Sequence, residues 1–568
     1  MDIVRAGTSP PRAARGIFVP SLLTRLLRTH AMAAPADHAA PPTAATAGFW
    51  QSPAFAVAAA LVLAAALATA AGVSAAMHRP FWLDEIVTQL VANAPHGLLH
   101  AMRSGVDFQP PPHYLLVRWA DALAGGASPA AARMPSVIAA LLTVAVLVVS
   151  LRAAVSLAAA LVGALALVAH PLFVAQAFEA RPYALWILAT ALVAESLREG
   201  RAARVWWAAG ASALLCSVHY FGVLSLAAIA TAVVGYTLLA RRASWRDAAQ
   251  AAAPLGAGGL ALLALLPLAR AQLASTGGRS WVSPSTLGEI GGFLRFAWGW
   301  RPAAVLIVAG IVMLAARRFP AVARRLPTAP RITLNVTVVA LLASALVPLL
   351  VVVVTLTYKP VLVLRYSAPA VLAVATLCAL AVETLPVLLR WGAVLWLARA
   401  ALFSLGSAAS GARVETALLA SEAQVVQTLA ARGVPTVSPS RHDAYRTSEL
   451  SSGTAGVAWL ELSDSLLDRA AATGAGNLTR DFLLVERDFG RAVHREFGFP
   501  ATRAVEQVRA DSAVALLRDP ALAGADSVWL PGRTPCPLSG RLVIFTRPPS
   551  VLPCGALRTA LQVDPSRR

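Results

Sequence analysis

The stretch LNVTVVALLASALVPLLVVVVTLT at residues 334–357 contains no charged side chain. A bilayer core requires about 20 apolar residues in a helix, so this stretch is long enough to cross a membrane. Windows of this kind recur about 11 times along the chain, and at most about 13 times. They lie at 54–77, 134–151, 153–170, 182–198, 204–220, 222–240, 249–269, 302–316, 334–357, 361–382 and 390–406. The predicted fold is therefore an α-helical polytopic membrane protein.

Composition supports this class and excludes others. The 568 residues are 58% hydrophobic and only 13% charged, which is rare for a soluble protein of this length. The formal net charge of +20 raises the possibility of a nucleic-acid partner. No basic stripe is interleaved with stacking aromatic residues, however, and most arginines lie in short loops between apolar runs. We therefore expect no nucleic-acid partner.

The distribution of arginine predicts the orientation in the membrane. Residues 1–50 are rich in Arg, Pro and Ala, and we interpret them as a disordered cytoplasmic tail. The loops at 198–204, 241–246 and 317–331 are also rich in arginine and face the cytoplasm in this arrangement. The first outer loop is then 78–133. A bacterial inner (plasma) membrane is the predicted location.

The C-terminal part of the chain has the composition of a soluble domain. The predicted boundary separates a membrane domain at 51–408 from an extracytoplasmic α/β domain at 409–568, where helix-like stretches alternate with short apolar runs. Cys536 and Cys554 lie in this region. They form either a disulfide or two free thiols, and the sequence leaves both readings open.

The first outer loop begins HRPFWLDEIV at 78–87, with Asp84 and Glu85 where a helix leaves the bilayer. Carboxylates at this depth are costly unless they are used or solvated. The functional interpretation is a base that deprotonates a hydroxyl, or a ligand for a cation. The alternative is simply a solvated start of the loop.

Further polar groups follow in the same loop, where Asp107 precedes three prolines, His113 and Tyr114. Prolines are tolerated in the first turn of a helix, so they predict that a helix begins here. The stretch 114–123 is too short to cross the bilayer. We expect a juxtamembrane helix that lies in the interface.

These motifs occur in an order that resembles a known superfamily. They are LDE at 83–85, DFQPPPHY at 107–114, ARMPSVIAALL at 132–142, FEARPYAL at 178–185, VHYFG at 218–222 and LRYSAPA at 364–370. The set resembles the GT-C membrane glycosyltransferases, in particular bacterial relatives of protein O-mannosyltransferases and of the lipid A aminoarabinose transferase (glycosyltransferase family 39-like). The resemblance covers roughly residues 50 to 385. Where those relatives commonly have HPPLYY, this chain has QPPPHY, with Gln109 in place of a histidine and His113 in place of a tyrosine.

The resemblance implies transfer of a mannose- or arabinose-type sugar from a polyprenyl-phosphate donor to an acceptor hydroxyl, with inversion at the anomeric carbon. Asp84 is then the base, and Glu85 orients it or contacts the acceptor. Cations must stabilise the departing phosphate, which needs no general acid. The expected contacts of the donor phosphate and sugar are Arg181, Arg365, Lys359, Glu179 and Tyr183, with Glu179 paired to Arg181 or lying over the sugar. The acceptor or accessory residues are Asp107, His113, Tyr114, His219 and Tyr220.

For each cation, interfacial snorkelling is the alternative to phosphate binding. Asp84, Glu85 and Asp107 are hard oxygen ligands that suit a divalent cation, but the resemblance does not demand a metal, so we expect no metal and no cofactor. The expected partners are membrane lipid, the polyprenyl-linked sugar and a glycan, lipid or protein acceptor. The rival functions are a lipid or sugar transporter or flippase, and a non-catalytic envelope scaffold.

Overall fold

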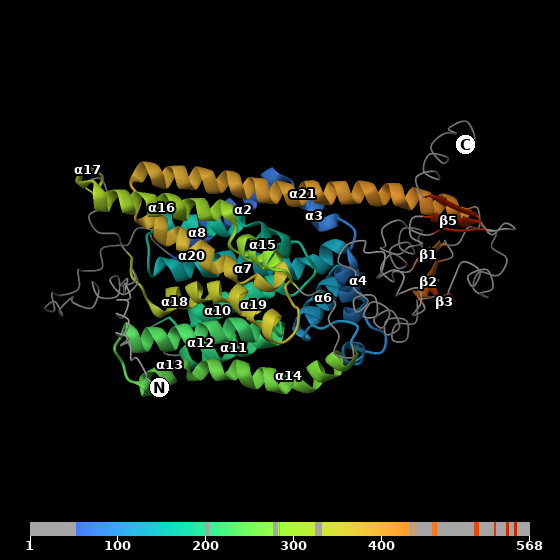
Figure 1. Ribbon diagram of the computed structural model, residues 1–568, viewed down its shortest axis with the longest axis horizontal. Coiled ribbons are helices and arrows are strands. Elements are labelled where there is room, and N and C mark those ends of the chain that lie inside the picture. Colours follow the sequence, from blue (N-terminus) through green and yellow to red (C-terminus); the bar gives the residue numbers. More distant parts are fainter. Residues whose placement is uncertain are drawn as a thin grey trace, which may run out of the picture.

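The computed structural model describes residues 53–198, 204–275, 282, 285–323 and 332–431, together with six strands between residues 436 and 553. Figure 1 shows the helices gathered into a bundle whose members run along the long axis of the view. The first half of the bundle contains α2 (Pro53–Ala71), α3 (Ser74–His78), α4 (Leu83–Ala92), α5 (Leu98–Arg103), α6 (Pro112–Leu123), α7 (Pro129–Arg152), α8 (Leu157–Ala169), α9 (Pro171–Ala177), α10 (Tyr183–Ser196), α11 (Arg204–Val218) and α12 (Gly222–Leu239). The second half contains α13 (Trp245–Ala252), α14 (Gly256–Ser275), α15 (Leu287–Trp298), α16 (Trp300–Arg318), α17 (Pro320–Ala323), α18 (Val336–Ala343), α19 (Val347–Thr357), α20 (Ala370–Glu383) and α21 (Val387–Ala431), with short 3-10 helices such as η4 (Leu364–Ser367).

A helix is present in every window that the sequence predicts to be a span. Among the described residues, six helices are long and apolar enough to cross a membrane, and the number is up to seven if the bent pair α8 and α9 forms one span. The helices α10 and α20 and the apolar part of α2 are also apolar, but each is shorter than the 18 residues required of a span here. The chain is a multi-pass membrane protein, and the count of about 11 spans stays a prediction.

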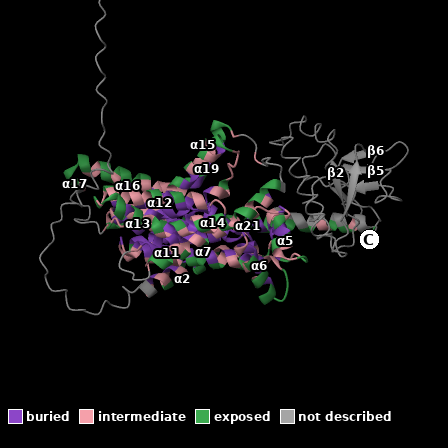
Figure 2. Ribbon diagram, turned by 90° about the horizontal axis from the view of Figure 1, so that it is seen from below, coloured by how far each residue is buried: buried purple, intermediate pink, exposed green. Residues whose placement is uncertain are grey.

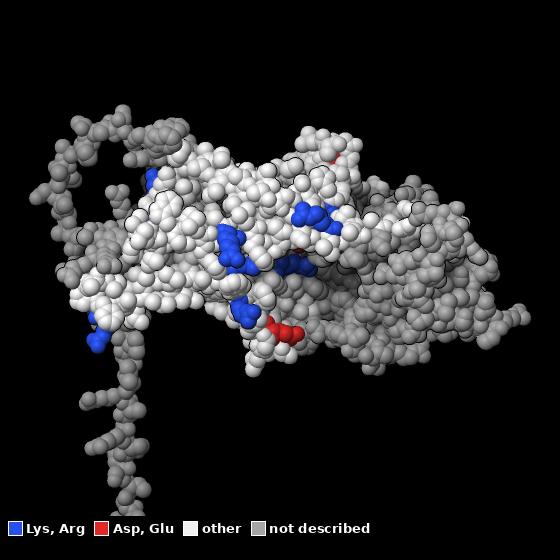
Figure 3. Space-filling model, turned by 90° about the horizontal axis from the view of Figure 1, so that it is seen from above, with Lys and Arg blue, Asp and Glu red and all other residues white. Residues whose placement is uncertain are grey.

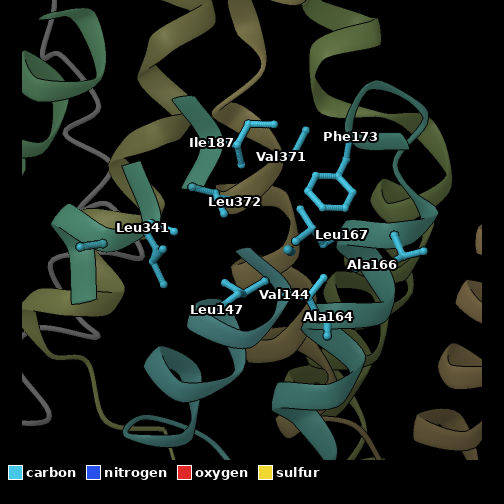
Figure 4. Packing of buried hydrophobic residues seen from close by; sticks show 14 of the residues in the cluster. Val144, Leu147, Ala164, Ala166, Leu167, Phe173, Ile187, Leu341, Val371 and Leu372 are labelled. Atoms are coloured by element: carbon cyan, nitrogen blue, oxygen red, sulfur yellow. The ribbon is translucent and has the colours of Figure 1, made fainter. Parts of the chain in front are cut away.

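The interior of the bundle is built from α7, α8, α10 and α20. Figure 4 shows Val144 and Leu147 of α7 facing Leu167 of α8, with Val371 and Leu372 of α20 in the same cluster. Many of the buried neighbours are alanines, and small side chains let membrane helices approach closely. Figure 2 shows the buried residues concentrated toward the middle of the bundle.

The outer surface of the bundle is apolar. Leu260 and Leu263 on α14 and Ile307 and Ile311 on α16 are all exposed. The face drawn in Figure 3 carries few charged side chains among the described residues. Such a surface suits contact with lipid rather than water.

The two ends of the bundle differ in charge. In Figure 1, α4 and α6 lie at one end, and α13 and α17 lie at the opposite end. Arg241 and Arg242 precede α13, and Arg317 and Arg318 close α16 next to α17. The arginine-rich loops are thus separated from the acidic motif as the topology requires, while the side of the membrane that each end faces stays a prediction.

The first outer loop folds into short helices that carry the acidic motif. α6 is present over the stretch predicted to form a juxtamembrane helix, and its first turn contains the expected proline at position 112. Its residues His113 and Tyr114 are buried, whereas Trp119 and Leu123 are exposed. One face of α6 therefore packs against the protein and the other is available to the membrane interface.

A sharp bend between α8 and α9 turns the chain toward this end of the bundle. The two helix axes meet at 71° where Pro171 begins α9. The His170 ring caps α9, because its Nδ1 accepts a hydrogen bond from the backbone N–H of Leu172 at 3.3 Å. Gly299, at the start of α16, packs against the same ring with a φ of +64°.

Substitution of Gly299 by alanine is expected to destabilise the protein by about 1–3 kcal/mol. An alanine Cβ would lie 2.6 Å from His170 Nε2, in a backbone conformation that side chains disfavour. Gly310→Ala in the same helix is the matched control, since a Cβ there meets nothing within 4 Å. Thermal melting in detergent should show a lower midpoint for Gly299→Ala only. Equal midpoints for the two variants would contradict the packing described.

α21 continues past the predicted domain boundary at residue 408 without a break, so that boundary is not an element boundary. The described strands beyond it form one sheet in the order β3-β2-β1-β4-β5-β6, parallel from β3 to β4 and antiparallel from β4 to β6. They are β1 (Thr436–Ser438), β2 (Val457–Leu462), β3 (Val505–Ala510), β4 (Ser527–Trp529), β5 (Arg541–Ile544) and β6 (Ser550–Pro553). The α/β class of this region stays a prediction. Cys536, Cys554 and the predicted tail at 1–50 lie outside the described residues.

Candidate active site

The acidic motif lies in the first turn of α4, where Asp84 and Glu85 both benefit from the positive end of the helix dipole. The Glu85 side chain also caps its own helix, because its Oε2 accepts a hydrogen bond from the backbone N–H of Trp82 at 3.3 Å. The motif is therefore fixed by local structure before any tertiary contact is made. Its two carboxylates then point to different partners.

Glu85 is fully buried in an ion pair with Arg133 of α7. Arg133 Nε donates to Glu85 Oε1 at 2.8 Å and Arg133 Nη2 donates to Oε2 at 2.6 Å. The backbone N–H of Ala180 donates to the same Oε1 at 2.8 Å. With no exposed surface, the Glu85 carboxylate has no room to contact an acceptor, contrary to one of the two roles expected for it. Its place supports the other role, positioning of the acidic turn.

Asp84 is partly exposed and lies between two guanidinium groups. Its Oδ2 is 3.0 Å from Nη2 of Arg365, in η4, and 4.0 Å from Nη2 of Arg181. The side chains of Asp84 and Arg365 are 20% and 19% exposed, so a ligand can reach both. The motifs LDE, EARPY and LRY, which are far apart in the sequence, thus meet at one point.

Arg181 forms an ion pair with Asp107. Its Nη1 donates to Asp107 Oδ2 at 2.6 Å and its Nη2 donates to Oδ1 at 3.3 Å, a two-pronged contact. The same Nη1 donates to the backbone oxygen of Asp84 and to the Thr88 hydroxyl. Burial raises the pKa of Asp107, but the Arg181 charge and the hydrogen bonds from Arg181, Tyr114 and the Phe108 N–H together outweigh burial, so the pKa is lowered. The expected ion pair of Glu179 with Arg181 is absent from this cluster, since Asp107 takes that place.

Glu179 lies in the turn between α9 and α10. Burial and the neighbouring negative charge of Glu85 raise its pKa to about 7, against the opposing effect of Arg79 and Arg365. Among the described residues, no hydrogen bond or ion pair engages its carboxyl group.

Aromatic rings line the side of the cluster formed by α10 and the start of α12. The His219 ring stacks on Trp186 with ring centres 4.5 Å apart, and Tyr183 lies 5.2 Å from His219. The Arg365 guanidinium lies 5.8 Å from the centre of the Tyr183 ring. Burial lowers the pKa of His219 to about 3, and the Arg181 charge adds to this effect. His219 is therefore neutral at physiological pH and does not hold an anion by charge.

The remaining predicted accessory residues surround Asp107. Burial lowers the pKa of His113 to about 4 and raises that of Tyr114 well above its usual value, so both are neutral. The Tyr220 hydroxyl donates to Gln272 Oε1 at 2.7 Å, and Gln272 Nε2 donates to the backbone oxygen of Gln109 at 3.3 Å. This chain connects α14 to the QPPPHY segment, so these groups shape the wall behind Asp107.

Lys359 is the last of the predicted phosphate contacts, and its role stays a prediction. It is half-buried after α19, and burial lowers its pKa. No ion pair joins it to Asp84, Glu85 or Asp107 within the described part of the chain. Contact with the donor and interfacial snorkelling both stay open for Lys359.

The expectation that the site needs no metal stays a prediction. Each of the three carboxylates considered as hard ligands has a guanidinium partner of its own. In the described ranges, no group of three or more His, Cys, Asp and Glu side chains could hold a metal ion. The cluster also holds two guanidinium groups, a partly exposed Arg365 and a buried Arg181, which are groups that bind oxyanions.

Two arginines of the cluster were not singled out in the sequence. Arg133 belongs to the ARMPS motif, and a fully buried arginine in an apolar helix requires a carboxylate partner, which was the available signal. Arg79 stands just before α4 and lies 3.9 Å from Glu85 Oε2 and 3.4 Å from Glu415 Oε2 of α21. Nothing in its sequence context indicates this second contact.

No protein-family model matches the chain. No curated protein matches it either. Among solved structures, the chain is similar to ArnT from Cupriavidus metallidurans bound to undecaprenyl phosphate, at 17% identity over 78% of this chain and 78% of that chain, with a TM-score of 0.40. It is also similar to ArnT from the same organism in the apo state, at 14% identity over 79% of this chain and 89% of that chain, with a TM-score of 0.39.

Proposed function

We propose that this protein is a membrane glycosyltransferase that moves a sugar from a polyprenyl-phosphate donor to an acceptor hydroxyl. The observation that carries the proposal is the pair of guanidinium groups, Arg365 and Arg181, gathered on the partly exposed Asp84 at the end of an apolar bundle. A phosphate leaving group needs fixed cations, and the carrier lipid needs an apolar surface beside them. Both requirements are met at one place.

The reaction proposed is a single displacement. The acceptor oxygen attacks the anomeric carbon from the face opposite the phosphate, so the configuration at that carbon inverts. Arg365 and Arg181 stabilise the charge that develops on the phosphate oxygen as its bond to the sugar breaks. A carboxylate of the cluster takes the acceptor proton, and the LDE motif makes Asp84 the first candidate for that base.

The other residues support these groups. Asp107 fixes the direction of Arg181, and the Glu85 pair with Arg133 fixes the turn that carries Asp84. Tyr183 is buried and supports Arg365 from within the bundle, whereas the ring of Tyr366 beside it is only partly buried, which suits contact with the apolar face of a sugar. A mannose- or arabinose-type sugar and a glycan, lipid or protein acceptor complete the proposal.

Purified protein in nanodiscs, given radiolabelled polyprenyl-phosphate-mannose or polyprenyl-phosphate-arabinose together with membranes, should convert one donor to labelled product. Asp84→Asn removes the charge that holds both cations, and we expect it to lower the rate at least about tenfold. Thermal melting of the same sample shows whether the variant is folded. The proposal fails if neither donor is consumed, or if Asp84→Asn consumes it as fast as the wild type. Movement of intact donor across proteoliposomes without transfer would favour the flippase instead.

A further inference from the structure

The two residues that follow Glu179 in the chain, Ala180 and Arg181, both hydrogen-bond to the acidic turn of α4. The Ala180 N–H donates to Glu85 Oε1 at 2.8 Å. The Arg181 Nη1 donates to the backbone oxygen of Asp84 at 3.2 Å. Glu179 is therefore held beside Asp84 and Glu85 by contacts that do not involve its own side chain.

Every other carboxylate at this end of the bundle that we have described is already engaged by a guanidinium group. Asp84 lies 3.0 Å from Arg365, Glu85 is held by Arg133, and Asp107 is held by Arg181. Glu179 makes no hydrogen bond or ion pair with any described residue, and it is half-buried rather than enclosed. Its carboxyl group is thus open to a ligand and uncommitted.

The charges that face Glu179 come from three segments. Asp84 and Glu85 on α4 disfavour its ionised form, whereas Arg79 before α4 and Arg365 in η4 favour it. Burial is the largest influence, and together these bring the pKa of Glu179 to about 7. A general base is most effective when its pKa lies near the working pH. Asp84, in contrast, is occupied in holding two cations that the donor phosphate requires.

We propose that Glu179, and not Asp84, takes the proton of the acceptor hydroxyl, an inference that rests on the proposed glycosyltransferase function. In this step the acceptor oxygen forms a bond to the anomeric carbon as the bond from that carbon to the phosphate oxygen breaks. The electron pair of the broken bond leaves with the polyprenyl phosphate, which Arg365 and Arg181 receive. The hydroxyl proton passes to the Glu179 carboxylate and then to water. Asp84 positions the two arginines.

The test is the pH dependence of transfer by the full-length protein in nanodiscs, for the wild type, Glu179→Gln and Asp84→Asn. Only ionised Glu179 accepts a proton, so kcat/KM of the wild type should rise with pH and level off above about 7. Glu179→Gln should lower kcat by about 10²–10⁴-fold and abolish this rise, with little change in the KM for the donor. Asp84→Asn should lower the rate but keep the rise near pH 7. Glu179→Asp should recover part of the rate.

The outcomes separate the two proposals. If the wild type transfers sugar but Glu179→Gln keeps the full rate or the same pH dependence, Glu179 is not the base, and the proposed function stands without it. If the wild type consumes no donor, the proposed function fails, and this inference fails with it. Burial disfavours the charged form of Glu179, so Glu179→Gln should melt at the same or a higher temperature than wild type at pH 8. A lower melting temperature with unchanged pH dependence would show a structural role and overturn the inference.

Discussion

Arg133→Met is expected to lower the free energy of unfolding by about 3–5 kcal/mol, because it leaves the buried carboxylate of Glu85 without its partner. The loss extends beyond the ion pair. Arg133 Nη1 also donates to the backbone oxygens of Ala76, Met77 and Arg79 at 3.1, 3.0 and 2.7 Å. Arg133 therefore holds the turn of the chain between α3 and α4 in place. We expect the variant to lose sugar transfer as well as stability.

Thermal melting in detergent, followed by size-exclusion chromatography, measures this effect. Arg118→Met is the matched control, since Arg118 is exposed on the neighbouring helix α6 and should change stability by no more than about 0.5 kcal/mol. The double variant Glu85→Leu with Arg133→Met should recover part of the loss, because no buried charge then remains unpaired. A melting midpoint for Arg133→Met equal to that of the wild type would refute the anchoring role.

Arg365→Gln is expected to reduce kcat by about 10²–10³-fold, the usual effect of removing one group that stabilises a developing anion. The side chain is 19% exposed, and its removal leaves Asp84 with Arg181 4.0 Å away. The fold should consequently survive, since Arg181 and Asp107 remain paired. The measurement is single-turnover transfer at saturating donor, which isolates the chemical step.

Two further variants test which cation contacts the donor phosphate. Arg365→Lys keeps the positive charge but loses the planar fork, so we expect an intermediate rate. Lys359→Ala should change the rate by only a few fold, because Lys359 has no ion pair with the cluster among the described residues. If Lys359→Ala and Arg365→Gln lowered the transfer rate equally, the donor phosphate would not bind at the site formed by Arg365 and Arg181 beside Asp84.

The helices and the members of the cluster were largely accessible from the sequence. The length of an apolar stretch alone identifies windows such as 334–357, because the thickness of the bilayer sets how many apolar residues a crossing helix needs. Prolines at 110–112 mark the start of α6 for a local reason, the missing N–H at a first helical turn. The motifs around Asp84, Arg181 and Arg365 do converge, as their shared order along the chain suggests.

The pairing of charges was not accessible from the sequence. Glu179 was expected to pair with Arg181 or to lie over the sugar, and Arg181 binds Asp107, which is 74 positions away. Glu85 was expected to orient Asp84 or to contact the acceptor, and its carboxylate is buried against Arg133. Spacing along the chain shows which residues can reach a place, but packing of α4, α7 and the α9 to α10 turn decides which oxygen meets which nitrogen.

At about 1.5 Å per residue, the 45 residues of α21 extend about 67 Å, roughly twice the thickness of a hydrocarbon core. The helix acts as a stiff rod, fixed along the bundle at one end and continuing toward the sheet at the other (Figure 1). Glu415 of α21 forms an ion pair with Arg79, the residue that also faces Glu85. One continuous helix therefore joins the sheet region to the loop that precedes Asp84, through this ion pair and through its packing against α3.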